Sequence, residues 1–155
     1  MNKTNAMRIL DRAKLQYEVA EYEYDENDLN GKHIAEGMGV PYSQVFKTLV
    51  TRGQGGYYVF CIPVDKELDL KKCARAAGVK SVEMIAVKEM LSVTGYIRGG
   101  CSPVGMKKQY PTFFDKSALE QNKIAVSAGV RGGQIIMSPK SLIDFTKSKI
   151  EELTQ

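Results

Sequence analysis

The chain has 155 residues, the length of one domain, and its 43% apolar and 26% charged residues are the shares of a folded globular protein. A net charge of +4 and a pI near 8.9 suit an anionic partner but fall short of the loading of a dedicated duplex-binding protein. No secretory signal and no apolar run of about 18 residues is present. We therefore expect one soluble, cytoplasmic domain over residues 1–155 with no membrane contact.

Three cysteines and a single histidine limit the available chemistry. Cys61, Cys73 and Cys101 are far apart and form no CxxC pair, so the spacing predicts neither a disulfide framework nor a zinc site. His33 leaves one imidazole base for the whole chain. No GxxxxGK[ST] or GxGxxG loop occurs, which disfavours nucleotide hydrolysis. We expect neither a metal nor a cofactor.

The first third of the chain alternates between helical and extended patterns. Residues 4–15 carry an apolar stripe at helical spacing behind a threonine that can cap the helix. Residues 17–24 are rich in tyrosine and valine and predict a strand, and the polar stretch 25–30 predicts a loop. A short helix over 32–38 is expected to end at a glycine.

The clearest pattern is a β-hairpin. Two apolar segments, 46–51 and 57–62, flank the turn sequence Gly-Gln-Gly-Gly at 53–56. Asp69 then caps a predicted helix that runs to Gly78.

The remaining elements are shorter, and together they predict an α/β fold. We expect a single domain with a mixed, partly closed β-sheet flanked by helices, because strands and helices alternate irregularly around at least one hairpin. A polar tail over 148–155 is expected to fray. Further expected elements are a strand at 81–84, a helix at 87–91, strands at 123–128 and 134–137 around a turn at 129–133, and a last helix opened by Ser138 and Pro139.

Lys47 is the first candidate for function because it interrupts an apolar run, Val-Phe-Lys-Thr-Leu-Val. A strand this hydrophobic is expected to be covered on both faces, and buried lysines are rare. On these residues alone the preferred explanation is a lysine that guards an edge strand or extends to water. The alternative is a cation that points into a cleft.

Two glycine-rich segments are further candidates. The stretch 94–105, Thr-Gly-Tyr-Ile-Arg-Gly-Gly-Cys-Ser-Pro-Val-Gly, can present backbone N–H groups to a phosphate, a carboxylate or an oxyanion, or can be a structural turn. The turn after Ser127 carries Arg131, which can clamp a phosphate or remain solvated.

The sequence gives less support to a nucleophile pair and to a basic track. A Cys101/His33 nucleophile pair is disfavoured, since a surface or capping role suffices for His33. Several basic residues lie near these segments, and a charged face exposed to solvent is their ordinary explanation. If they flanked the same cleft as Lys47, they would instead form a track that binds phosphates. These basic residues are Lys71, Lys72, Arg75, Lys107 and Lys108.

Taken together, the segments VFKTLV, TGYIRGGCSPVGMKK and VSAGVRGGQI resemble the YbaK/EbsC family of aminoacyl-tRNA deacylases, in the same order along nearly the whole chain. The resemblance implies that the essential lysine is Lys47 and that a GxxxP loop comprises Gly99, Gly100, Cys101, Ser102 and Pro103. The family does not require cysteine at position 101. It further implies a substrate pocket lined by Tyr22, Thr48 and Ser127. Val130 departs from the family pattern, which commonly has lysine there, so the phosphate contact near Arg131 is in doubt.

The function implied by the resemblance is removal of cysteine from mischarged Cys-tRNA(Pro), or also from Cys-tRNA(Cys), by a trans-editing enzyme. Partners would be the aminoacylated 3′ end of tRNA and prolyl-tRNA synthetase. Attack by the substrate's own thiol would explain why one histidine is enough, and water attack is the simpler alternative. Deacylation of Ala-tRNA(Pro) or another small amino acid, and a non-catalytic module that binds a tRNA end or a synthetase, are the other hypotheses.

Overall fold

The computed structural model describes residues 1–155 and contains eight strands in two sheets. The strands are β1 (Glu18–Glu21), β2 (Phe46–Gly53), β3 (Gly56–Pro63), β4 (Val82–Met84), β5 (Thr112–Asp115), β6 (Ile124–Ser127), β7 (Gly133–Met137) and β8 (Lys149–Glu151). One sheet has the order β4-β2-β3-β5-β8, and the other has the order β1-β7-β6. In the larger sheet β2 is antiparallel to β3 and β4, whereas β5 is parallel to β3 and β8. The predicted mixed sheet is therefore confirmed.

Five α-helices surround the sheets. They are α1 (Asn5–Arg12), α2 (Gly31–Met38), α3 (Leu70–Ala77), α4 (Met90–Thr94) and α5 (Pro139–Thr146), with short 3-10 turns at Tyr42–Gln44, Val87–Glu89 and Lys116–Glu120. The predicted caps are in place, because the Thr4 hydroxyl accepts from the Met7 N–H and the Asp69 carboxylate accepts from the first turn of α3. None of the helices is long and apolar enough to cross a membrane.

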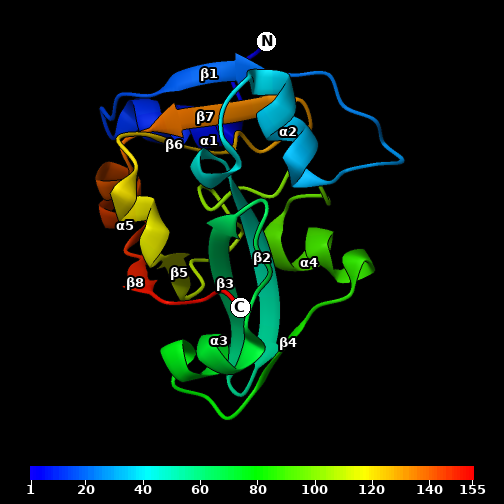
Figure 1. Ribbon diagram of the computed structural model, residues 1–155, viewed down its shortest axis with the longest axis vertical. Helices are drawn as coiled ribbons and strands as arrows, with labels where there is room; N and C mark the ends of the chain where they lie inside the picture. Colours follow the sequence, from blue (N-terminus) through cyan, green and yellow to red (C-terminus); the bar gives the residue numbers. More distant parts are fainter.

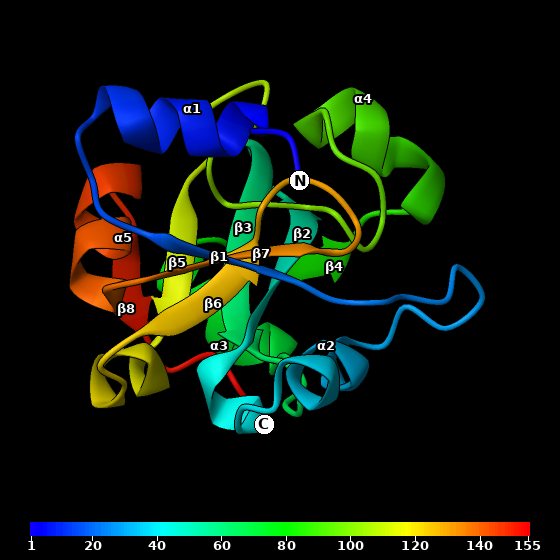
Figure 2. The same ribbon diagram turned by 90° about the horizontal axis from the view of Figure 1, so that it is seen from above.

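The two sheets lie across each other and enclose the main core (Figures 1 and 2). They are joined at one parallel bridge, between Val45 just before β2 and Ala125 of β6. Through this bridge the two sheets form a partly closed structure. Apolar side chains of α1, α5 and both sheets fill the space between them, with Leu10, Phe114 and Ile135 fully buried. A second cluster lies on the other face of the larger sheet, under α3.

Two strands, β5 and β8, were not predicted, and the C-terminal tail does not fray. β8 pairs with β5, the Leu153 N–H donates to the Asp115 carboxylate at 3.0 Å, and the Leu153 side chain is fully buried against Phe60 and Phe113 in the cluster under α3. The expectation of a frayed end at 148–155 was wrong, because one buried leucine and one sheet pairing hold a segment whose other residues are mostly polar.

Candidate active site

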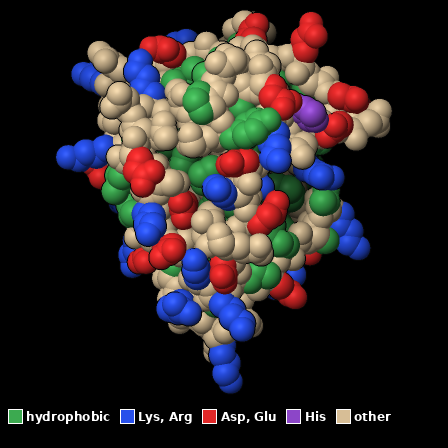
Figure 3. Space-filling view, in the orientation of Figure 1, with side chains coloured by type: hydrophobic (Ala, Val, Ile, Leu, Met, Phe, Trp, Pro, Cys, Tyr) green, Lys and Arg blue, Asp and Glu red, His purple; other side chains and the backbone are tan.

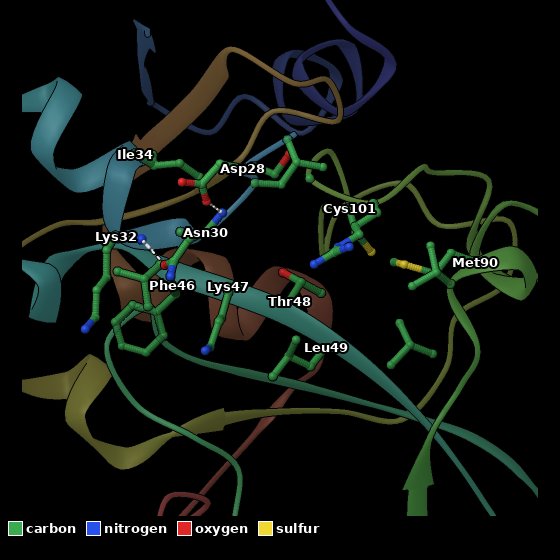
Figure 4. A pocket seen from close by; sticks show the side chains of 18 of the residues that line it. Asp28, Asn30, Lys32, Ile34, Phe46, Lys47, Thr48, Leu49, Met90 and Cys101 are labelled. Carbon is green, nitrogen blue, oxygen red and sulfur yellow. Dashed lines mark hydrogen bonds between the residues drawn. The ribbon is translucent and has the colours of Figure 1, made fainter. Parts of the chain in front are cut away.

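A cleft of about 660 Å³ opens between α2, β2 and the segment that leads from β4 into α4. Figure 3 shows apolar side chains gathered in this part of the surface, with charges of both signs around them. The close view in Figure 4 shows β2 crossing the cleft, with Asp28 and Asn30 on one side and Met90 and Cys101 on the other.

The cleft follows an unpaired edge of β2. β4 pairs with β2 only from Thr51 onward, and β6 meets the same edge only at the bridge between Val45 and Ala125, so the stretch between these points is paired on the β3 side alone. The Val45 carbonyl accepts from Val64 on the β3 side, whereas the Val50 carbonyl accepts from Ile85 on the opposite side. By the alternation of an antiparallel strand, the backbone groups of residue 48, which lies between these two contacts, also face the cleft. The strand thus contributes both side chains and backbone to the site.

Lys47 extends from the half-exposed face of β2. It lies opposite Ile62 in the register, and its side chain retains 26% of its exposure. Its one carboxylate neighbour is Glu67, with Nζ and Oε1 3.9 Å apart. The expectation that this strand is covered on both faces was wrong at Lys47, because the face that carries this side chain opens into the cleft. The ammonium group therefore makes one long ion pair and stays partly exposed in the cleft.

Thr48 points to the opposite face of β2, as side chains alternate along a strand (Figure 4). It is 8% exposed and lies opposite Cys61, whose thiol donates to the Thr48 hydroxyl oxygen at 3.7 Å. The hydroxyl hydrogen of Thr48 is left without an acceptor in the protein, so it can donate to a bound group.

The glycine-rich loop faces β2 across the cleft through two of its residues, Gly99 and Cys101. Gly99 has φ +85°, and a Cβ at this position would lie 3.3 Å from both methyl groups of Leu29. The N–H of Gly100 is already bonded to the Ile97 carbonyl. The N–H groups of Gly99 and Cys101 have no acceptor in the protein and are free for a ligand.

The other loop residues expected at the site do not line this cleft. Ser102 is fully buried and its hydroxyl accepts from the Val104 N–H, which stabilises the loop. Pro103 lines a separate surface depression beside α5. Gly100, Ser102 and Pro103 therefore lie behind the part of the loop that faces the cleft, where they support its shape.

Cys101 and His33 do not meet. Burial raises the pKa of the Cys101 thiol to about 12, so the thiol is neutral at physiological pH. Both ring nitrogens of His33 are 2.9 Å from carboxylates, those of Glu36 and Asp28. His33 lines the neighbouring pocket and not the cleft that contains Cys101.

The cleft ends at the paired strands β6 and β7. Ser127, which was predicted, and Gln134, which was not, lie opposite each other in the register and both line the cleft. The Ser127 hydroxyl accepts from the Gly129 N–H at 3.1 Å. Gln134 gave no sequence signal beyond an amide at the start of an apolar strand.

A second pocket of about 420 Å³ adjoins the first and contains the two remaining candidates, Tyr22 and Arg131. The two pockets share the loop Asp28–Asn30 and Gly99 as a common wall. Arg131 donates from Nε to the Arg98 carbonyl at 2.8 Å, which ties the β6–β7 turn to the glycine-rich loop.

The charges at the cleft are mixed. Lys32, Lys47 and Arg98 line it, together with four carboxylates, Glu26, Asp28, Asp65 and Glu67. None of the basic residues considered for a phosphate track lines the cleft, and Lys72, on α3, is bonded to Glu152 and the Thr154 carbonyl. The cations that line the cleft are therefore Lys32, Lys47 and Arg98 alone.

The family model of the aminoacyl-tRNA editing domain matches residues 31–145. This protein belongs to that family. The editing domain is 46% identical over 153 residues to EbsC of Enterococcus faecalis, which carries the name of a Cys-tRNA(Pro)/Cys-tRNA(Cys) deacylase; the match covers 98% of this chain and 93% of the relative.

Part of the editing domain also resembles a much larger enzyme. Proline–tRNA ligase of Thermosipho africanus is 32% identical over 85 residues, which are 55% of this chain and 15% of the ligase. A solved structure titled as a trans-editing enzyme for prolyl-tRNA synthetase superimposes with a TM-score of 0.85 at 24% identity, over 100% of this chain and 99% of that one, and shows the same fold. The matched family segment includes β2, the glycine-rich loop and β6–β7, but not Tyr22.

Proposed function

We propose that this editing domain is a trans-acting deacylase that removes cysteine from mischarged Cys-tRNA(Pro). The observation that carries the proposal is that Lys47 and Thr48 of β2 share one cleft with Gly99 and Cys101 of the glycine-rich loop. The name of the Enterococcus faecalis relative supports the cysteinyl substrate. The size of the cleft, about 660 Å³, suits an aminoacylated terminal adenosine.

The residues of the cleft suit an ester that is already reactive. Such a substrate needs to be oriented, and the charge that develops on its carbonyl oxygen needs a donor. The free N–H groups of Gly99 and Cys101 are the proposed donors to that oxygen. Lys47 would hold the phosphate of the terminal nucleotide, and the Thr48 hydroxyl would contact the aminoacyl group. A base of high strength is not required.

For a cysteinyl ester the substrate's thiol is the proposed nucleophile. The sulfur forms a bond to its own carbonyl carbon, the ester C–O bond breaks, and the thiol proton passes to the released 3′-oxygen of tRNA. Orientation of the two reacting groups alone can supply about 7–11 kcal/mol in favourable intramolecular reactions. This route fits a site whose protein thiol, Cys101, has a pKa of about 12 and whose histidine lies elsewhere.

The test is deacylation of tRNA(Pro) charged with cysteine, by wild type, Lys47→Ala and Lys66→Ala. Lys66 is an exposed lysine outside the cleft and serves as the matched control. We expect release by wild type and Lys66→Ala, and a loss of at least about 100-fold in Lys47→Ala. Equal ester lifetimes with wild type and in buffer would contradict the proposal. Binding without turnover would instead favour a non-catalytic module.

Assays on other aminoacyl esters identify the preferred amino acid and the nucleophile. Faster release of alanine than of cysteine would replace the proposed substrate with Ala-tRNA(Pro). Full activity on an S-methylated cysteinyl ester would replace thiol attack with water attack.

Prolyl-tRNA synthetase is the proposed partner, because the cleft has few cations with which to select a tRNA body. Addition of the synthetase should then raise the rate at which a limiting amount of this editing domain deacylates Cys-tRNA(Pro).

A further inference from the structure

The β4–α4 side of the cleft exposes apolar side chains at its edge. Met84 at the end of β4 and Val87 in the 3-10 turn that follows both line the cleft, and they are 46% and 59% exposed. We call these two residues the apolar rim. Single apolar side chains on a surface need no explanation, whereas neighbouring ones at the edge of a cleft indicate a contact with a ligand or partner.

The fold holds the apolar rim in place without burying it. Between the two rim residues, the Ile85 N–H donates to the Val50 carbonyl of β2, and the Ile85 side chain is buried. The Glu89 carboxylate accepts from the Ala86 N–H and also forms an ion pair with Arg52 of β2. The segment is therefore fixed to the larger sheet at both ends, so the exposure of its apolar side chains does not come from loose packing.

The charges of the cleft are not spread evenly along its wall. The four carboxylates that line it come from the loop before α2 and from the segment after β3. The lining residues between 84 and 90 are uncharged, and Figure 4 shows Met90 across the cleft from Asp28. Glu83 and Lys88, which flank the rim, have opposite charges and do not line the cleft. Since RNA carries a negative charge on every nucleotide, the rim is the side on which no lining carboxylate repels it.

Lys47 and Met84 lie on the same face of the larger sheet. Met84 is opposite Thr51 in the register of β2 and β4, and side chains at 47, 49 and 51 point to one face. Leu49, between them, also lines the cleft. Four residues of strand, about 13 Å, separate Lys47 from Thr51. An RNA whose terminal phosphate is at Lys47 can therefore bring the base of the preceding nucleotide to the rim.

We propose that the base of the nucleotide before the terminal adenosine packs on the apolar rim when an aminoacylated 3′ end is bound. This inference rests on the proposed function, in which Lys47 holds the phosphate of the terminal nucleotide. Every unstacked base has an apolar face, and methionine makes favourable contacts with aromatic rings. The contact raises the affinity for a single-stranded 3′ end and leaves the choice among tRNA bodies to a partner.

The experiment compares the 3′-cysteinyl ester of the dinucleotide CpA with the same ester in which hydrogen replaces the cytosine. The proteins are wild type, Met84→Ser/Val87→Ser and Leu91→Ser. Leu91 is the matched control, because it is an exposed apolar residue of α4 outside the cleft. Wild type and Leu91→Ser should show a kcat/KM about fivefold higher on the ester that has the base. In the rim variant the two values should be equal.

Three results would overturn the inference. They are no preference for the base in wild type, an unchanged preference in the rim variant, and an equal loss of preference in Leu91→Ser. If the rim variant keeps the preference but loses binding to prolyl-tRNA synthetase, the rim is a protein docking surface and the inference also fails.

Two further measurements keep the inference separate from folding and from the proposed function. The rim variant should keep the midpoint of thermal unfolding of wild type, because both side chains are exposed, and Val87→Ser alone is the second variant. If wild type releases no cysteine from either ester, the proposed function fails. Binding of the corresponding 3′-cysteinylamino compounds, which have a stable amide in place of the ester, still tests the inference: wild type should prefer the one with the base, and equal affinities would overturn it.

Discussion

Leu29 packs directly on Gly99, with both of its methyl groups 3.3 Å from the point where a Cβ of residue 99 would lie. Gly99 also has φ +85°, a conformation that L side chains rarely adopt. Leu29 belongs to the loop that separates the two pockets, so this contact joins the wall of the cleft to the glycine-rich loop.

Gly99→Ala should lower both stability and deacylation. The left-handed backbone costs about 1–2 kcal/mol with a side chain present, and the new methyl must displace Leu29. Gly39→Ala is the matched control, since Gly39 has φ +70° but no atom within 4 Å of its Cβ position. Urea unfolding should show a loss in both variants, and the deacylation assay a loss in Gly99→Ala alone. Equal activities of the two variants would contradict the role of the loop.

Thr48→Val should reduce deacylation by about tenfold with little change in stability, because it removes a hydroxyl that only a weak thiol donor uses within the protein. The control is Thr51→Val on the same strand. Thr51 is fully buried and donates to the Tyr58 carbonyl at 2.9 Å, so its loss should cost about 1 kcal/mol without slowing the reaction. Unchanged deacylation in Thr48→Val, together with a loss in Thr51→Val, would contradict the contact between Thr48 and the substrate.

His33 should contribute stability that depends on pH. Hydrogen bonds to the carboxylates of Glu36 and then Asp28 raise its pKa above the ordinary 6.5. The contribution is then fully present below the pKa of the unfolded chain and is lost as pH rises through the higher folded value. The difference in unfolding free energy between wild type and His33→Gln should shrink from pH 5.5 to pH 9. NMR titration should show a lower pKa for His33 in Asp28→Asn, and an unchanged value would contradict this contact.

The three cysteines should resist alkylation in the folded protein. Burial raises the pKa of the thiols of Cys61, Cys73 and Cys101 to about 12 in each case. Because the thiolate is the reactive form, iodoacetamide at pH 8 should leave the native mass unchanged and add three groups after denaturation. Rapid modification of Cys101 alone would show that the glycine-rich loop opens in solution.

Leu153→Ala should destabilise the protein by about 2–5 kcal/mol, the usual effect of removing a fully buried leucine side chain. Leu119→Ala is the control, since Leu119 is 58% exposed and its loss should change stability by about 0.5 kcal/mol or less. Chemical denaturation measures both. A small effect at Leu153 would mean that the tail is dispensable.

The sequence alone determined the local structure of the editing domain and the order of its motifs. The hairpin at 53–56, the capped helices and the polar loop at 25–30 follow from residues near in sequence, which is why they were predictable. β5 and β8 were missed because each is too short to show a period of its own, and distant partners, Phe60 and Leu153 among them, decide their pairing.

What surrounds Lys47 was decided only by the tertiary structure. The sequence presents it as a cation in an apolar strand, and the open stretch of the β2 edge around residue 48 is left because β4 and the single bridge to β6 do not cover it. The separation of Cys101 from His33 and the unpaired amide of Gln134 also depend on how the two sheets cross at Val45 and Ala125. Side chains far apart in sequence meet only through that packing, so no local pattern could predict them.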